Sequence, residues 1–328
     1  MQRRLCYALI VIAAATGIAI AKPVTPDASR EARALLRAIT RISGRNTLSG
    51  QHNLANTRSS YSEQVQKATG KTPAIWSSDF GFAATGDDAI TGRDALSAEA
   101  KRQFADGCVI ALTWRAVRPV EDEPSGLKNS VQAKLADEQW QELLTAGSPL
   151  RKRWEAQVDV IAGYLKQLRD SRIPVLWRPY AEANGAQYWW AGRAGDNGSS
   201  ALYKQLFERL ATYHKLNNLI WVWTATTDSE AGAPESFYPG SSYCDLLAAG
   251  VHDGNYAQAL YDSMGKLAAG KPIALGEVGG VPTPAVLKSQ MKWAWFMVWA
   301  DLLRVSKPEV VRELFNDEHT LSRGNRLP

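Results

Sequence analysis

The chain has 328 residues, of which 45% are hydrophobic, and a formal net charge of +5. Its length suffices for one large core or two modest ones. The positive charge is spread along the chain without a basic stripe, which argues against a nucleic-acid partner. Twelve tryptophans are unusual; they fit either core packing or a surface for flat apolar faces such as sugar rings.

The first 21 residues have the pattern of a secretory signal peptide. Two arginines lie within Met1–Arg4, Leu5–Ile20 is apolar, and Ala19-Ile20-Ala21 fits a cleavage site. An apolar run of about sixteen residues is short for a membrane span. We therefore predict an exported protein, periplasmic or secreted, whose mature chain covers residues 22–328 and has no membrane span. Cys108 and Cys244 lie in apolar runs and are expected to be buried thiols.

Eight apolar runs of strand length follow one another, most of them separated by a helical segment. The strands are expected at 47–50, 73–77, 107–114, 175–178, 219–223, 244–248, 273–276 and 295–299. Strands that are apolar on both faces and alternate with helices indicate a parallel sheet. Eight such units predict an α/β fold, a single-domain (β/α)8 TIM barrel. A doubly wound open sheet is the alternative, but no glycine-rich phosphate loop opens the first unit.

Two of these strands each deliver a glutamate. Glu182 follows the fourth strand in VLWRPYAEANGAQYWW (175–190), and Glu277 follows the seventh in KPIALGEVGG (271–280). Catalytic groups gather at the carboxyl ends of barrel strands, so both carboxylates are expected to face one cleft. Glycoside hydrolysis needs such a pair, one as an acid and one as a nucleophile or base. A surface charge is the ordinary alternative for a single glutamate.

Motifs along nearly the whole mature chain carry a family resemblance. They are LSGQHN (48–53), TGKTPAIWSSDFGF (69–82), TWRAVRPV (113–120), LWRPYAEANG (176–185), YWW (188–190), LIWVW (219–223), FYPG (237–240), KPIALGEVG (271–279) and WAWFMVWA (293–300). In this order and spacing the chain resembles glycoside hydrolase family 26, the β-mannanase family. The resemblance implies a retaining mechanism with Glu182 as the acid/base and Glu277 as the nucleophile. The reaction needs no cofactor, and no metal-ligand cluster is apparent in the sequence.

Three single positions and one motif depart from the family pattern. Ala181 stands where a histidine usually precedes the acid/base, Arg115 where a histidine is usual, and Gln187 where a sugar-stacking tryptophan is usual. Gly250 and His252 replace the Asp and Tyr of an Asp-x-Tyr motif. His252 could make the contact to the nucleophile that the tyrosine would make, because imidazole can also donate a hydrogen bond. With both glutamates retained, these departures favour changed substrate recognition over loss of activity.

For several of the remaining site residues, the sequence allows both a structural role and a role in substrate binding. Arg115 could bind a substrate carboxylate with its bidentate guanidinium, or form an ion pair with a carboxylate such as Asp79. Arg178 is expected to support the catalytic carboxylates rather than to bind sugar directly. The stacking candidates are Trp190, Trp223 (for which core packing is the alternative) and, on the last strand, Trp295 or Trp299.

These observations predict an exported retaining hydrolase of β-glycosidic bonds in a polysaccharide. It would resemble mannan endo-1,4-β-mannosidases, with an altered subsite, and act as a monomer. The alternatives are a β-glucanase or xylanase, a hydrolase of acidic exopolysaccharides, and a non-catalytic glycan-binding barrel.

Overall fold

The computed structural model describes residues 22–228 and 230–325, so the predicted signal peptide at 1–21 lies outside the described residues. Strands and helices alternate along the chain. The strands are β1 (Thr47–Asn53), β2 (Ile75–Asp79), β3 (Val109–Trp114), β4 (Val175–Pro179), β5 (Leu219–Thr226), β6 (Leu246–Val251), β7 (Ile273–Val278), β8 (Trp293–Val298) and β9 (Thr320–Leu321). The α-helices are α1 (Arg30–Ile42), α2 (Ser60–Thr69), α3 (Arg93–Ala105), α4 (Asp137–Leu144), α5 (Pro149–Asp170), α6 (Ser199–Phe207), α7 (Gln258–Ala268), α8 (Pro284–Ser289) and α9 (Pro308–Asn316).

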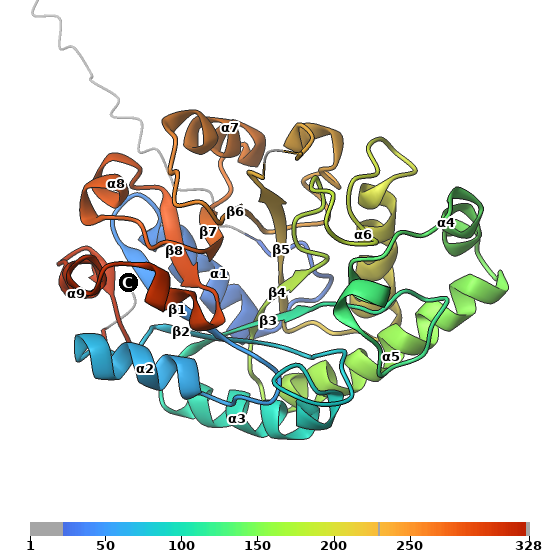
Figure 1. Cartoon of the computed structure of the whole chain (residues 1–328), viewed down its shortest axis with the longest axis horizontal. Helices are drawn as coiled ribbons and strands as arrows, with labels where there is room; N and C mark the ends of the chain where they lie inside the picture. Colours follow the sequence, from blue (N-terminus) through green and yellow to red (C-terminus); the bar gives the residue numbers. More distant parts are fainter. Residues whose placement is uncertain (1–21, 229, 326–328) are drawn as a thin grey trace, which may run out of the picture.

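The first eight strands form a closed parallel barrel. Each strand from β1 to β8 pairs with the next, and β8 pairs in parallel with β1, which closes the circle (Figure 1). The predicted (β/α)8 fold is confirmed, and the open-sheet alternative is wrong because the first and last strands of the barrel are hydrogen-bonded. The short β9 pairs with the beginning of β1 and, like α9, is not among the predicted elements.

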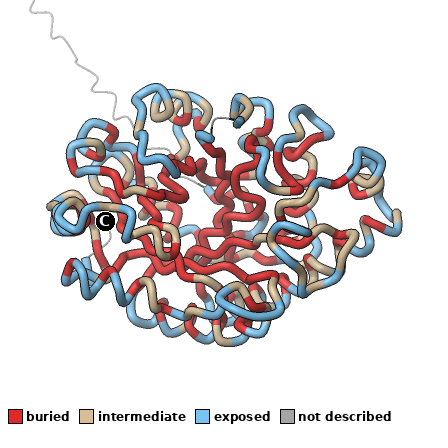
Figure 2. The backbone as a smooth tube through the Cα atoms, viewed as in Figure 1, coloured by how far each residue is buried: buried red, intermediate tan, exposed pale blue. Residues whose placement is uncertain are grey.

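Alternate strand residues pack into two separate cores. On β5, Val222 joins an inner cluster that helix α1 completes, whereas Trp221 joins an outer cluster with the surrounding helices. Helix α1 lies at the amino end of the barrel, because the Ser29 amide donates to the Asn217 carbonyl just before β5. The buried centre and exposed rim follow from this arrangement (Figure 2). The amino end is thus covered, and the carboxyl end is left for function.

Local sequence signals account for the longest helix, α5. Ser148 accepts a hydrogen bond from the Arg151 amide, and Pro149 occupies the first helical turn, where its missing N–H costs nothing. The helix therefore begins two residues before the predicted start at Arg151. Over the described ranges, no helix is both long and apolar enough to cross a membrane. Cys108 and Cys244 are free and buried, as predicted.

The cover that α1 forms at the barrel's amino end should be essential for stability. Ile39 has no exposed surface and belongs to the inner core. We expect Ile39→Ala to lower the free energy of unfolding by about 2–5 kcal/mol, because a buried cavity replaces the side chain. Arg41→Gln, on the exposed side of the same helix, should cost less than about 1 kcal/mol. Urea denaturation of both variants checks this, and equal losses would contradict the assignment of the inner core.

Candidate active site

A cleft of about 380 Å³ opens at the carboxyl end of the barrel. It is lined by Arg115, Leu127, Gln132, Glu182, Gln187, Tyr188, Asp228, His252, Glu277 and Trp299. Another hollow, of about 460 Å³, lies at the beginning of β3 beside α1 and has an almost wholly apolar lining. Only the first of the two brings acidic and basic side chains together.

Glu182 is held in a strained loop directly after β4. Its φ is +61°, and that of Tyr180 is +48°, a left-handed conformation that non-glycine residues rarely adopt. The Asn184 side chain ties the loop to β5, donating to the Thr226 carbonyl at 3.0 Å and accepting from the Thr226 amide at 2.8 Å. Glu182 is only 2% exposed. Strain of this kind persists where the surrounding structure fixes a side chain for function.

Glu277 reaches the cleft because β7 is irregular. Leu275 packs in the outer core, and strict alternation would place Glu277 on that same outer face. The pairing of β7 with β6 skips Gly276, and this bulge turns Glu277 inward. A Cβ on Gly276 would lie 2.9 Å from the Cβ of Ala248, so the position has no room for a side chain.

Arg178 supports Glu277 from within the barrel. Its side chain is fully buried and donates to the Gly276 carbonyl at 2.6 Å and to Glu277 Oε1. Burial raises the pKa of Glu277, and the charge of Arg178 opposes that rise. Arg178 is not one of the residues that line the cleft. These contacts agree with a supporting role rather than direct sugar binding.

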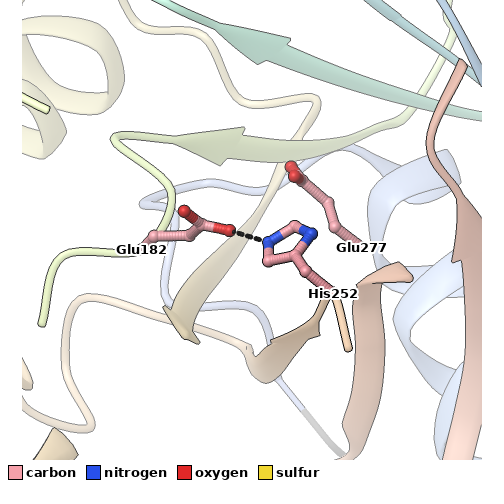
Figure 3. A group of neighbouring side chains, drawn as sticks. All are labelled: Glu182, His252 and Glu277. Carbon is pink, nitrogen blue, oxygen red and sulfur yellow. Dashed lines mark hydrogen bonds and ion pairs between the residues drawn. The ribbon is translucent and has the colours of Figure 1, made fainter. Parts of the chain in front are cut away.

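His252 contacts Glu182, although the sequence suggested a contact with Glu277. The imidazole follows β6, and its Nε2 lies 2.5 Å from Glu182 Oε1 (Figure 3). This hydrogen bond is the main reason that the pKa of His252 rises to about 9. One side-chain atom from each of Glu182, His252 and Glu277 lies within 4.8 Å of the others. The two carboxylates therefore share one cleft, and His252 joins them.

The same three side chains form a group that could hold a metal ion, which the sequence did not suggest. A tetrahedral zinc site with bonds of about 2.0 Å separates its ligand atoms by about 3.3 Å. The 2.5 Å between His252 Nε2 and Glu182 Oε1 is well below that separation and is short even for a hydrogen bond. The spacing therefore favours a proton, rather than a metal, between these two groups.

Arg115 lines the cleft but its charge is already paired. Its Nε lies 3.2 Å from Asp79 Oδ2, and its Nη2 donates to Asp88. The guanidinium carbon lies 5.1 Å from the Phe82 ring centre and 5.2 Å from that of Trp299. The predicted ion pair with Asp79 is confirmed. An arginine tied to two carboxylates has little capacity left for a carboxylate of the substrate.

Three of the four predicted stacking candidates do not line the cleft. Trp223 and Trp295 have no exposed surface, and Trp190 is 1% exposed. Trp223 points to the outer core, and Trp295 fills the barrel interior, so direct stacking on sugar is wrong for both. Trp190 instead supports Tyr188, whose ring stacks on it at 4.5 Å. Of the two tryptophans considered at the last strand, Trp299 lines the cleft.

Five of the nine predicted site residues line the cleft, and other lining residues had not been predicted. Glu182, Glu277, Arg115, Gln187 and His252 are in the first set. The second set includes Leu127, Gln132, Tyr188 and Asp228. Tyr188 could have been found from the run YWW, in which the first aromatic is the one closest to the loop tip. Leu127 and Gln132 come from the long 116–150 segment, which carries no local signal.

Comparisons with known proteins agree with the barrel and the cleft. The model of the family described as Glycosyl hydrolase family 26 matches residues 24–325. The chain belongs to this family. A mannan endo-1,4-beta-mannosidase of Thermothelomyces thermophilus is 32% identical, with 90% of this chain and 61% of that protein covered. A Bacillus subtilis protein of the same name is 26% identical, with 98% and 94% covered.

Solved structures of the family superimpose on the whole barrel. The structure of GH26A from Muricauda sp. MAR_2010_75 has a TM-score of 0.88 and 39% sequence identity, covering 91% of this chain and 98% of that one. A Podospora anserina GH26-CBM35 β-(1,4)-mannanase has a TM-score of 0.77 and 26% identity, covering 92% and 68%. This chain spans 61% of the Thermothelomyces protein, so that protein has further sequence outside the match. The family resemblance that the motifs carry is thereby confirmed.

Removing Arg178 should destabilise the protein as well as the site. Without it, the carboxylate of Glu277 stays buried with its principal counter-charge missing. We expect Arg178→Ala to lower the free energy of unfolding at neutral pH by about 3–5 kcal/mol. The exposed pair of Arg304 and Asp301 is the matched control, and Arg304→Ala should cost at most about 1 kcal/mol. Chemical denaturation measures both, and a stable Arg178→Ala protein would contradict this role.

Proposed function

We propose that this chain is a retaining endo-β-mannanase in which Glu182 is the acid/base and Glu277 the nucleophile. The observation that carries the proposal is the closeness of the two carboxylates, whose nearest oxygens lie within 4.8 Å in one cleft. Carboxyl groups about 5–5.5 Å apart are typical of retaining enzymes, whereas inverting enzymes leave about 6.5–9.5 Å for a water molecule. The shorter separation favours direct attack by Glu277 on the sugar.

The two steps follow from this geometry. Glu277 attacks the anomeric carbon with its carboxylate while the bond to the leaving oxygen breaks, and Glu182 gives its proton to that oxygen. Water then attacks the same carbon, Glu182 accepts a proton from it, and Glu277 leaves as a carboxylate. Arg178 supports this role because it favours the charged form of Glu277, which both attacks and departs.

Mannan is the proposed substrate because two relatives that match 90% and 98% of the chain are named as mannan endo-1,4-beta-mannosidases. The charge of the cleft agrees with a neutral polymer. The carboxylates of Glu182, Glu277, Asp79, Asp88 and Asp228 stand in or beside it, against the cations Arg115, Arg178 and His252. A surplus of carboxylates disfavours a polyuronate. The half-buried rings of Tyr188 and Trp299 line the cleft and offer aromatic surface to sugar rings.

We also propose that residues 1–21 act as a signal peptide, so that the enzyme meets its polysaccharide outside the cytoplasm. Extracellular or periplasmic action suits a substrate that is too large to be imported. When the full chain is expressed in a host that exports proteins, mass spectrometry of the exported protein should find Lys22 at its amino terminus.

Product analysis over a polysaccharide panel tests the substrate. We expect release of manno-oligosaccharides from mannan, with little release from xylan, β-glucan or polyuronates. Preferential turnover of a polyuronate would contradict the charge argument. Absence of reducing sugar from every polymer, together with binding to mannan, would instead favour the non-catalytic barrel.

Rescue by azide tests the two roles separately. Glu182→Ala should lose about 10²–10⁴-fold in kcat/KM on mannan. With azide and an activated aryl mannoside it should form a glycosyl azide of retained configuration, because azide replaces the second-step water. Glu277→Ala should lose turnover by roughly four orders of magnitude or more and form the inverted azide. If Glu182→Ala gave the inverted azide and Glu277→Ala the retained one, the two assignments would be reversed. Asp301→Ala serves as a surface control.

A further inference from the structure

His252 is bound to the carboxylate that the proposed mechanism protonates and deprotonates in every cycle. Its Nε2 lies 2.5 Å from Glu182 Oε1. Figure 3 shows this nitrogen pointing at the Glu182 oxygen, with Glu277 on the other side of the imidazole ring. His252 follows β6 and Glu182 follows β4, so β5 separates their strands in the barrel. The contact is therefore built by the fold rather than by neighbours in the sequence.

Gly250 leaves the space for this contact. A Cβ at that position would lie 3.0 Å from Glu182 Oε1 and 3.4 Å from His252 Nε2, the two atoms that share the hydrogen bond. Its φ is not in the left-handed range, so the backbone does not require glycine there. The missing side chain lets the carboxylate and the imidazole meet.

The charged groups around His252 favour an imidazolium. Glu182 bonds it, and Glu277 from β7 and Asp228 from the end of β5 add negative charge. The nearby cations, Arg178 of β4 and Arg115 after β3, instead act on Glu277. Together with the hydrogen bond to Glu182, these carboxylates raise the pKa of His252 to about 9 despite partial burial.

A comparison with His52 shows that the surroundings of each imidazole decide the direction in which its pKa shifts. It is also an imidazole at a strand end, but it is fully buried, its Nδ1 bonds Ser77 at 2.9 Å, and its neighbours include Arg178 and Arg115. Burial and these cations hold its pKa well below the usual range. His252 is thus the imidazole at this end of the barrel that keeps a proton at neutral pH.

We propose that His252 and Glu182 share one proton and work as a single acid/base unit, with His252 as the positioning residue and proton reserve. This inference rests on the proposed role of Glu182. At neutral pH the pair consists of a carboxylate and an imidazolium. When a glycoside binds, the proton moves from Nε2 to Oε1 along the hydrogen bond, which leaves a carboxylic acid and a neutral imidazole.

The proton balance closes over one turnover. In the first step the acid gives its proton to the leaving oxygen, so the pair holds none while the sugar is attached to Glu277. In the second step the attacking water gives one proton to Glu182, and the proton returns to Nε2. Between the steps the imidazole is neutral, so it does not oppose proton uptake by Glu182. A second permanent cation at this place would oppose it.

The consequence is an extended alkaline range. A lone glutamate, with an ordinary pKa of about 4.3, keeps its proton only in acid. The pair keeps one proton until pH rises through the raised pKa of His252, about 9. Activity that depends on this proton is therefore present below about pH 9 and falls above it.

The experiment compares pH profiles of kcat/KM on mannan for the full enzyme and His252→Gln, which can donate a hydrogen bond but carries no exchangeable charge. We expect the alkaline limb to move at least about one pH unit towards acid, with a loss of roughly tenfold or more at pH 8 and a smaller loss at pH 5. Gly250→Ala should move the limb in the same direction. An unchanged limb in His252→Gln would overturn the proposal.

His214 provides a matched control, because its Nε2 bonds Asp159 at 2.7 Å far from the cleft. His214→Gln should leave the profile unchanged.

Imidazole NMR titration gives a readout that does not need turnover. His252 should titrate near pH 9 in the wild type and near its ordinary value of about 6.5 in Glu182→Gln. Titration near 6.5 in both proteins would overturn the shared proton even if the enzyme hydrolyses mannan. Titration near 9 in a protein that hydrolyses no polysaccharide would instead show that the proton pair is real and the proposed function is wrong.

Discussion

Two carboxylates in one buried cleft oppose each other's charge, and the site depends on how the barrel compensates for this. Glu182 is 2% exposed and Glu277 is 6% exposed, so neither has much water to stabilise it. Arg178 bonds Glu277, and His252 bonds Glu182. The two cations differ in a way that matches the proposed roles. An arginine never gives up its proton at neutral pH, which suits a nucleophile that must stay ionised, whereas a histidine can.

Each carboxylate also depends on a local departure from regular backbone geometry. The Glu182 loop has two left-handed residues, and the β7 bulge reverses the face on which Glu277 lies. Such distortions persist only when the surroundings over-determine them. Here the closed barrel supplies that constraint, because an apolar cluster packs inside it and α1 covers the end opposite to the cleft.

The sequence predicted the barrel and the two glutamates that share its cleft, because both depend on features that short patterns reveal. Apolar runs alternate with helices, and the order of the runs places Glu182 and Glu277 at strand ends that converge. The sequence did not predict which face of each strand points into the barrel. Trp223 lies on the outer face of β5, and the adjacent Ala294 and Trp295 both join the inner core. A period of two indicates alternation, but it cannot assign faces or reveal a bulge.

The hydrogen-bond partner of His252 could not be predicted from the sequence, for a related reason. Convergent strand ends predict that His252 approaches the carboxylates, but a choice between Glu182 and Glu277 depends on distances of a few ångströms. The loop after β4 decides it, together with the space above Gly250. Arg115 was ambiguous in the same way, since only the structure shows that Asp79 and Asp88 both reach its guanidinium.

The surplus of carboxylates in the cleft links substrate choice to proton supply. Negative charge from Glu277 and Asp228 helps to keep His252 protonated, and the same charge repels an acidic polymer. A neutral polysaccharide brings no further charge to the cleft when it binds. A polyuronate would bring further carboxylates to a cleft in which Arg115, and Arg178 behind it, are already paired. In the proposed mechanism, the carboxylates that hold a proton at high pH therefore also favour uncharged sugars, and Arg115 does not change that balance because its charge is paired with Asp79 and Asp88.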